Sequence, residues 1–408
     1  MDNALKPEPS NGSPSPAGVL AGGMLGLAVA MGIGRFAFTP ILPAMQRDTG
    51  LSHLMAGQLA SWNYLGYLAG SLGLALFIAL RRSRALYPGA LTASCLTTIA
   101  MGFTNSPAAW SVLRFLGGVA SALVFIALAA LVIPYMISVG KAGRTSLLFS
   151  GVGLGIAFTG AVTPLLDRMA GWRGGWIGLG VVAVILSLVS WRLIAPIHSV
   201  AFSSNASPSG PSRIGMLVTA YFLEGLGYIV TATFLVTIVK NTPGMAHWAA
   251  ASWIVVGLSA APSTIIWQTL SVRFGWRKAT TAAYLLQAAS LFVSTKAAGP
   301  VGILFSAAAF GGTFMGITSL SMGEGARRSG ANQSHTAAIL TMAYALGQIA
   351  GPVCAGWLAR SAGSFRLSLG LAGGCVLAGG ILTWLDKHGM QTAPNWDQAR
   401  LPTPFSDR

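Results

Sequence analysis

Charged residues are scarce in this chain of 408 residues: they make up 8% of it, and only nine are acidic. Soluble domains contain about 25% charged residues, so this composition excludes an ordinary soluble protein. Apolar runs fill the chain instead, and a bilayer crossing needs about 20 mostly apolar residues. We therefore predict an all-α polytopic membrane protein with twelve transmembrane helices. The predicted spans are 17–45, 51–80, 85–103, 108–138, 141–166, 173–195, 213–240, 247–271, 278–297, 299–323, 332–360 and 364–386.

Cysteine is also rare. Cys95, Cys354 and Cys375 all fall inside predicted spans and show no paired spacing, so we expect neither disulfides nor a metal site. The sequence contains no HExxH or GxSxG motif and no nucleotide-binding signature, and its five histidines are scattered. We expect no cofactor and no enzyme activity. A membrane-embedded enzyme and a channel remain the alternatives from other classes.

The basic excess, a formal net charge of +16, is spread through short loops. Because it forms no continuous basic run, we expect no nucleic-acid partner. If the N-terminus is inside, the inner loops hold more Lys and Arg than the outer loops, as cytoplasmic loops do. We therefore expect both termini in the cytoplasm. As a separate expectation, the protein is assigned to a bacterial inner membrane. The segments 1–16 and 388–408 have the composition of disordered tails.

The longest polar connection, residues 196–212, has the composition of a linker and separates six spans from six. Glycine-bearing segments recur across it at a nearly constant distance along the chain. GIGR at 32–35 matches GLGY at 225–228, and FLGG ending at Gly118 matches AFGG ending at Gly312. This repeat predicts an N-terminal half at 17–195 and a C-terminal half at 213–387. Parallel repeats of this kind bind substrate between the halves, near the middle of the bilayer.

Several segments resemble motifs of the major facilitator superfamily. RFLGGVASA at 114–122 resembles its fourth-helix motif, and SVRFGWRKA at 271–279 resembles its loop between the second and third helices of a half. GQIAGPVCAG at 347–356 resembles the Gly-Pro helix of its antiporters. GIGRFAFTPILPAM at 32–45 and EGLGYIVTATFL at 224–235 resemble its YbfB/YjiJ branch. The resemblance implies a twelve-helix transporter whose two six-helix halves rock about a central site.

Glu224 is the strongest candidate for a functional charge, because ionisable residues at membrane depth are costly and rarely incidental. It lies about 16 Å along a helix from Arg213, near the middle of the bilayer. Tyr221 and Tyr228, at positions i−3 and i+4, extend a polar stripe beside it. We expect Glu224 to couple transport to protons. A structural, hydrogen-bonded glutamate is the alternative.

Arg35 is the second candidate. The repeat aligns it with Tyr228, and in the resembling fold the first and seventh helices face each other across the cavity. We expect Arg35 to bind an anionic substrate group or to neutralise Glu224. Alternatively, it snorkels to the outer interface.

Other polar residues complete the candidate substrate and proton site. Asn63 and Tyr67, one turn apart, and Gln268 are expected to line the cavity. Arg114 is a candidate for proton coupling, because the resembling motif assigns that role to its arginine; snorkelling is the alternative.

Glu324 is expected at the cytoplasmic face. We predict that it forms a latch with Arg273 or Arg277 that breaks as the halves rock. A plain interfacial charge is the alternative.

These features predict a secondary active transporter that moves a small organic solute by alternating access, coupled to protons. Arg35 favours an organic anion, whereas Glu224 with its tyrosine neighbours also suits a lipophilic cation. The resemblance to antiporters favours export over organic-anion uptake by symport. The expected partners are a small-molecule substrate, protons and the lipid bilayer, and we expect a monomer.

Overall fold

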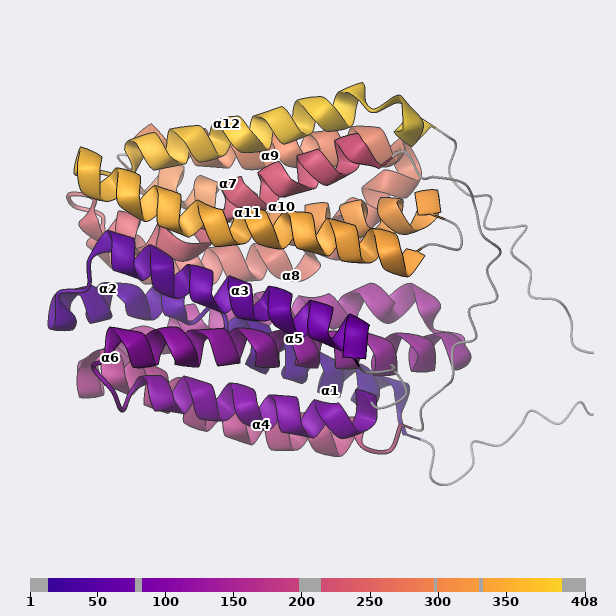
Figure 1. Cartoon of the computed structure of the whole chain (residues 1–408), viewed down its shortest axis with the longest axis horizontal. Coiled ribbons are helices and arrows are strands. Elements are labelled where there is room, and N and C mark those ends of the chain that lie inside the picture. Colours follow the sequence, from indigo (N-terminus) through magenta and orange to yellow (C-terminus); the bar gives the residue numbers. More distant parts are fainter. Residues whose placement is uncertain (1–13, 78–82, 198–213, 297–298, 330–332, 391–408) are drawn as a thin grey trace, which may run out of the picture.

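The computed structural model describes residues 14–77, 83–197, 214–296, 299–329 and 333–390. All regular elements in these ranges are helical (Figure 1). They are α1 Pro16–Leu27, the π-helical η1 Ala28–Ile33, α2 Phe38–Thr49, α3 His53–Phe77, α4 Ser83–Met101, α5 Pro107–Ser138, the 3₁₀ η3 Ala142–Phe149, α6 Ser150–Ile194, α7 Gly215–Asn241, the 3₁₀ η4 Ala246–Trp248, α8 Ala249–Phe274, α9 Trp276–Lys296, α10 Pro300–Ser329, α11 Gln333–Ala362, α12 Arg366–Leu385 and the 3₁₀ η6 Lys387–Met390.

The segments predicted as disordered lie largely outside the described residues. These are most of 1–16, most of the linker 196–212, and the tail after Met390. The first residues of the predicted tail, up to Met390, form the helical turn η6.

The first predicted span is irregular at its centre. Its α1 and α2 are separated by η1 and by residues 34–37, which form a turn. Pro40 has no N–H to give to the carbonyl of Phe36, and the N–H of Thr39 donates there instead, at 3.2 Å. The carbonyl of Arg35 thereby loses the donor that a regular α-helix would give it. The break therefore falls at Arg35.

The element α6 contains two predicted spans. Gly171 has a φ of 60° and a ψ of −158°, which side chains with a Cβ rarely tolerate. Residues near both ends of α6 lie against one part of α1: Gly151 approaches Met24, and Ile194 approaches Gly22. The chain therefore reverses at Gly171, and α6 is a helical hairpin. Counted so, the described residues supply one helical segment for each predicted span.

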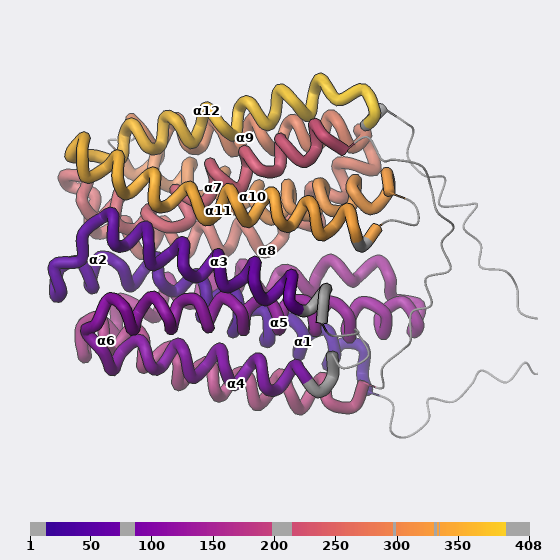
Figure 2. The backbone as a smooth tube through the Cα atoms, viewed as in Figure 1, coloured from indigo at the N-terminus to yellow at the C-terminus, as the bar shows by residue number. Residues whose placement is uncertain are grey.

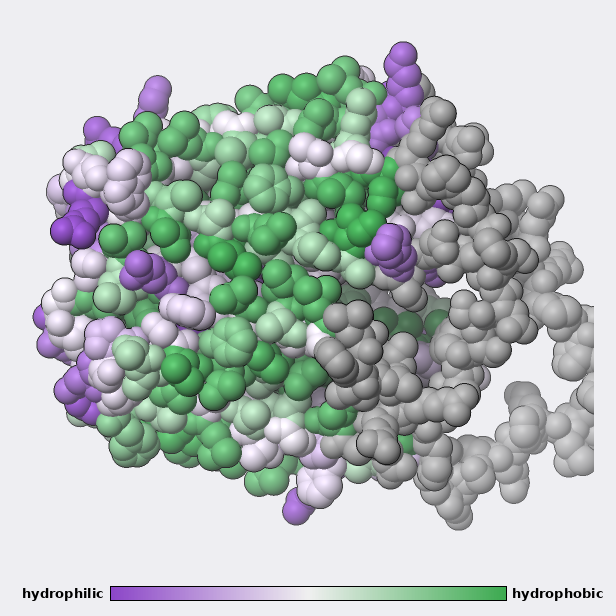
Figure 3. Space-filling model, in the orientation of Figure 1, coloured by the Kyte–Doolittle hydropathy of each residue, from purple (hydrophilic) through white to green (hydrophobic). Residues whose placement is uncertain are grey.

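A wide apolar surface surrounds the helices. Eight helical runs among the described residues are long and apolar enough to cross a membrane. Figure 3 shows a broad apolar belt across the middle of the molecule, with most hydrophilic side chains towards its ends. Many large apolar side chains on the helices are exposed, among them Leu188, Leu258 and Trp357. Such a surface matches lipid chains, which are themselves apolar.

The helices form two halves with the same packing pattern (Figure 1). In the N-terminal half, α3 and α4 pack on α5, and α6 packs on α1 and α4. In the C-terminal half, α8 and α9 pack on α10, and α12 packs on α7 and α9. These are corresponding pairs of the repeat, so the predicted all-helical fold with two repeated halves is confirmed. The precise domain boundaries stay a prediction.

The halves are in contact where α6 packs on α8, and also towards one end of the molecule. Because α1 begins and α12 ends at the same end (Figure 2), that end is called the terminal end and the opposite one the far end. Towards the far end, the hydroxyl of Thr39 donates to the carbonyl of Ala232 at 2.5 Å. At the crossing of α3 and α11, a Cβ on Gly57 would lie 2.2 Å from the carbonyl oxygen of Pro352. Helices this close leave no passage between them, so the far end is closed.

Gly57→Ala should loosen the far end, because the added methyl group forces α3 away from α11. The reporter is Thr237→Cys, at a buried position that hydrogen-bonds Gln46 across the halves, in protein whose native cysteines are replaced by serine. We expect its labelling by a water-soluble maleimide to rise several-fold with Gly57→Ala.

The matched control is Gly374→Ala, where an added Cβ meets open space; labelling should then stay at its original rate. Equal labelling with and without Gly57→Ala would contradict closure by this contact.

Candidate functional site

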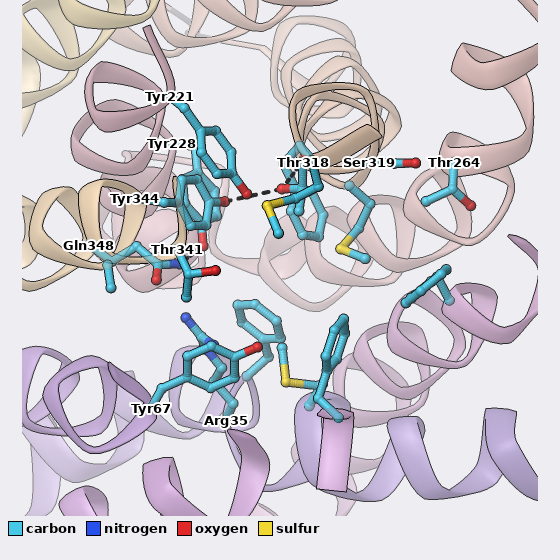
Figure 4. Close-up of a pocket in the computed structure, with 18 residues that line it drawn as sticks. Arg35, Tyr67, Tyr221, Tyr228, Thr264, Thr318, Ser319, Thr341, Tyr344 and Gln348 are labelled. Carbon is cyan, nitrogen blue, oxygen red and sulfur yellow. Dashed lines mark hydrogen bonds between the residues drawn. The ribbon is translucent and has the colours of Figure 1, made fainter. Parts of the chain in front are cut away.

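A cavity of about 330 Å³ lies between the two halves. Residues 31–36, α3, α5 and η3 line it from the N-terminal half, and α7, α8, α10 and α11 line it from the C-terminal half (Figure 4). Arg35 is the one charged side chain among the described residues that line it. The volume suits a small organic molecule.

Arg35 points from the N-terminal half toward the C-terminal half across this cavity (Figure 4). It is 3% exposed. Its guanidinium carbon lies 4.6 Å from the ring centroid of Tyr64 and 4.5 Å from that of Tyr67, within the range of cation–π attraction. Among the described residues no group accepts a hydrogen bond from its side chain, and no carboxylate pairs with it. The cation is therefore buried with aromatic neighbours but without a counter-charge.

Arg114 supports the backbone that carries Arg35. Its guanidinium donates to the carbonyl oxygens of Leu59 at 3.4 Å, Gly34 at 3.3 Å and Arg35 at 3.4 Å. The irregular turn leaves the carbonyl of Arg35 without its helical donor, and Arg114 replaces that donor. Arg114 is buried, so it does not snorkel to the interface. Its predicted part in proton coupling stays a prediction.

Four near-parallel rings from the C-terminal half line the cavity, and they are called the aromatic column: Tyr221, Tyr344, Tyr228 and Phe314. Successive ring centroids are 4.2, 5.4 and 5.8 Å apart, with interplanar angles of 12°, 8° and 8°. A fifth ring, Phe310, stacks on Phe314 with centroids 5.4 Å apart but does not line the cavity. The C-terminal half thus presents a stack of aromatic rings opposite Arg35 (Figure 4).

The polar groups of this wall are largely bonded to one another. The amide of Gln348 donates to the hydroxyl of Tyr228. The hydroxyl of Thr318 donates to that of Tyr344 at 3.5 Å. On the neighbouring wall, Thr264 donates to the carbonyl of Ser146 at 3.3 Å. The hydroxyls of Tyr228, Tyr344 and Thr264 therefore have protein partners.

Glu224 lies beside the cavity and not in it. It is fully buried, accepts a hydrogen bond from the amide of Gln287 at 2.6 Å, and has no partner for its second oxygen. With successive residues about 100° apart around a helix, Tyr221 and Tyr228 are both turned about 40–60° to the same side of Glu224. Those two rings face the cavity, whereas Glu224 faces α9. The predicted ion pair between Arg35 and Glu224 is not formed in this structure.

Of the other residues predicted to line the cavity, one does so and two do not. Tyr67 lines the cavity beside Arg35, but Asn63 and Gln268 do not line it. The buried amide of Asn63 donates to the carbonyl of Arg114 at 2.9 Å. Gln268 donates to Ser319, a lining residue, at 2.8 Å. These two residues support the site through others.

The predicted latch of Glu324 with Arg273 or Arg277 is not formed either. Glu324 pairs with Arg327 at 2.5 Å and with Arg328 at 2.7 Å, and Arg328 also pairs with Asp386 at 2.7 Å. These arginines follow Glu324 on its own helix at i+3 and i+4, where side chains meet without any movement. Arg273 and Arg277 lie instead over the rings of Phe274 and Trp384.

Several lining residues escaped the sequence analysis. Phe314, Tyr344 and Gln348 lie in apolar helices, where an aromatic residue looks like core packing. The useful signal was the spacing of Tyr344 and Gln348 by one turn, which places two polar groups on one helix face.

The fold matches solved transporter structures. The nucleoside transporter NupG superposes with a TM-score of 0.69 at 13% identity, covering 90% of this chain and 98% of that one. A point mutant of the same transporter superposes with a TM-score of 0.70 at 11% identity, covering 89% and 98%. At such low identity the likeness shows the fold alone.

The sequence also matches a family model, described as "Uncharacterised MFS-type transporter YbfB", over residues 27–383. That range covers nearly all of the described helices, and it confirms the resemblance found in the motifs. The chain is therefore a multi-pass membrane transporter of the major facilitator superfamily, and it belongs to the YbfB family.

Proposed function

We propose that the protein is a secondary active transporter that moves a small organic anion by alternating access and couples this movement to protons. The observation that carries the proposal is Arg35, a buried cation in the cavity between the halves, without a counter-charge. Burying an unpaired charge is costly, and a substrate carboxylate would supply the missing partner.

The closed far end supports alternating access. Cross-half contacts such as Thr39 with Ala232 lie towards that end. The cavity lining extends the other way, reaching Met322 near the terminal end of α10. If both termini are cytoplasmic, this is an inward-facing state. Transport then requires the far-end contacts to part while the halves close at the terminal end.

The charge distribution favours an anion over a lipophilic cation. No acidic side chain is among the described residues that line the cavity. Glu224, which a cation would need, faces away toward Gln287. A cation in the cavity would meet Arg35 as the one charge among the described lining residues and be repelled by it.

Glu224 is our candidate for the proton site. Its carboxyl group is buried with a neutral partner and one free oxygen. An ionised carboxylate is costly to bury in this way, so release of its proton requires water or a cation to reach it. A conformational change of α7 would supply such access, because Tyr221 and Tyr228 on the same helix line the cavity.

The direction of transport is the finer part of the proposal. Export in exchange for protons follows from the resemblance of 347–356 to antiporters, and we favour it. Uptake of the anion together with a proton is the alternative.

Arg35→Gln should weaken anion binding strongly, because the glutamine offers no positive charge. The assay is the rise in Tm of purified protein with benzoate, cyclohexanecarboxylate or hexanoate, since ligands of the folded state raise its stability. Losing a charge-assisted hydrogen bond should weaken binding roughly 10- to 100-fold, with Arg35→Lys intermediate.

The matched control is Arg277→Gln, an arginine on Trp384 away from the cavity, which should bind like wild type. Stabilisation by tetraalkylammonium ions and by none of the carboxylates would contradict an anion site.

Glu224→Gln should uncouple transport from protons, because the amide keeps the shape of the side chain but cannot release a proton. In proteoliposomes, a pH gradient should no longer drive net movement of a bound carboxylate, while exchange of labelled for unlabelled substrate continues. Asp48→Asn, at an exposed ion pair with Arg47, should keep coupling.

The sign of the gradient that drives wild-type uptake separates antiport from symport. If Glu224→Gln responds to the gradient like wild type, Glu224 is not the proton site.

A further inference from the structure

The aromatic column indicates the chemical nature of the part of the substrate that carries the anionic group. Its four rings are within 12° of parallel from neighbour to neighbour, and all four line the cavity. A ligand ring beside these stacked rings meets their edges, and edge-to-face ring pairs are favourable beyond the area that they bury. A saturated ring or chain contacts the same rings without that gain.

Arg35 defines the orientation of the anionic group. Two tyrosine rings lie over its guanidinium carbon, so its free hydrogen-bonding capacity is at the N–H edge. Those N–H groups lie in the guanidinium plane and match a carboxylate. Since Arg35 points toward the column (Figure 4), a carboxylate bound to it places the rest of the ligand against the rings.

Several of the hydroxyls around the cavity are already bonded to protein groups, which favours a ligand with few hydroxyl groups of its own. A sugar or a nucleoside ribose buried in this cavity needs partners for several hydroxyl groups. Here Tyr228 is held by Gln348, Tyr344 by Thr318, and Thr264 by a backbone carbonyl. A ligand with one anionic end and an apolar body leaves these bonds intact.

The remaining lining is apolar and adaptable. Met31, Met315 and Met322 join Phe125 and Phe149 around a volume of about 330 Å³. Methionine adjusts its shape and contacts aromatic rings favourably through sulfur. Such a cavity accommodates one or two fused rings.

We infer that the substrate is a planar aromatic monocarboxylate, with its carboxylate on Arg35 and its ring against the aromatic column. This inference rests on the proposed anion transport and narrows the substrate class of the same site.

The test compares benzoate with cyclohexanecarboxylate, which has equal charge and similar size but no flat ring, by calorimetric titration of the full-length protein in nanodiscs. Benzoate should bind between roughly twofold and tenfold more tightly, as expected for a favourable contact between aromatic rings. Benzamide, flat but neutral, should bind far more weakly than benzoate.

Two variants distinguish direct contact of a ring with the ligand from a structural role of that ring in the column. Phe314→Leu removes a ring of the column that lines the cavity, and Phe310→Leu removes a stacked ring that does not. Phe314→Leu should bring the affinity for benzoate down to that for cyclohexanecarboxylate and leave the latter unchanged within twofold. Phe310→Leu should preserve the preference. Both variants are first shown to be folded by their Tm and by a single gel-filtration peak.

The outcomes distinguish this inference from the proposed function. Equal binding of the two acids, with both lost in Arg35→Gln, would overturn the aromatic substrate and keep the anion transporter. If Phe310→Leu lost the preference for benzoate as fully as Phe314→Leu, direct contact of the ligand ring with the column would also be overturned. Binding of neither acid, or binding that survives Arg35→Gln, would overturn the anion site and the inference with it.

Discussion

The arrangement of the site depends on one buried cation. Arg35 lies at membrane depth in the cavity between the halves, with rings around it and no carboxylate beside it. Neither solvent nor lipid compensates such a charge well. The two tyrosines of α3 offset part of the cost through cation–π attraction, and the substrate would supply the rest. The protein therefore compensates the charge of Arg35 only in part, and an anionic ligand would complete the compensation.

The fold keeps this charge in place through its irregular first span. Pro40 breaks the regular hydrogen bonding, the turn at 34–37 directs Arg35 toward the cavity, and Arg114 takes up the unpaired carbonyls. Across the cavity, Gln348 and Thr318 hold the tyrosines of the opposite wall. The N-terminal half thus provides charge and the C-terminal half provides an aromatic surface, so a ligand that needs both contacts joins the halves.

Much of the architecture is predictable from sequence, because the bilayer imposes apolar segments of fixed length and the repeated glycines mark corresponding helix positions. Arg35 and Glu224 are visible for the same reason, as rare charges at membrane depth. Whether Arg35 and Glu224 face each other cannot be predicted from the sequence. A rotation of about 40–60° around α7 decides whether Glu224 meets the cavity or Gln287, and sequence spacing alone does not resolve it. Tyr344 and Phe314 were missed because lining rings and packing rings look alike in an apolar helix. The partners of Glu324 were nearer in the chain than the predicted ones.

The most direct measurement of the central claim is an experimental structure of the protein with 4-iodobenzoate, in which anomalous scattering locates the iodine. Our account predicts iodine density inside the cavity beside the aromatic column, with the carboxylate at hydrogen-bonding distance from the guanidinium of Arg35. A carboxylate bound elsewhere, or an Arg35 already paired with a protein carboxylate such as Glu224 in the ligand-free protein, would contradict it.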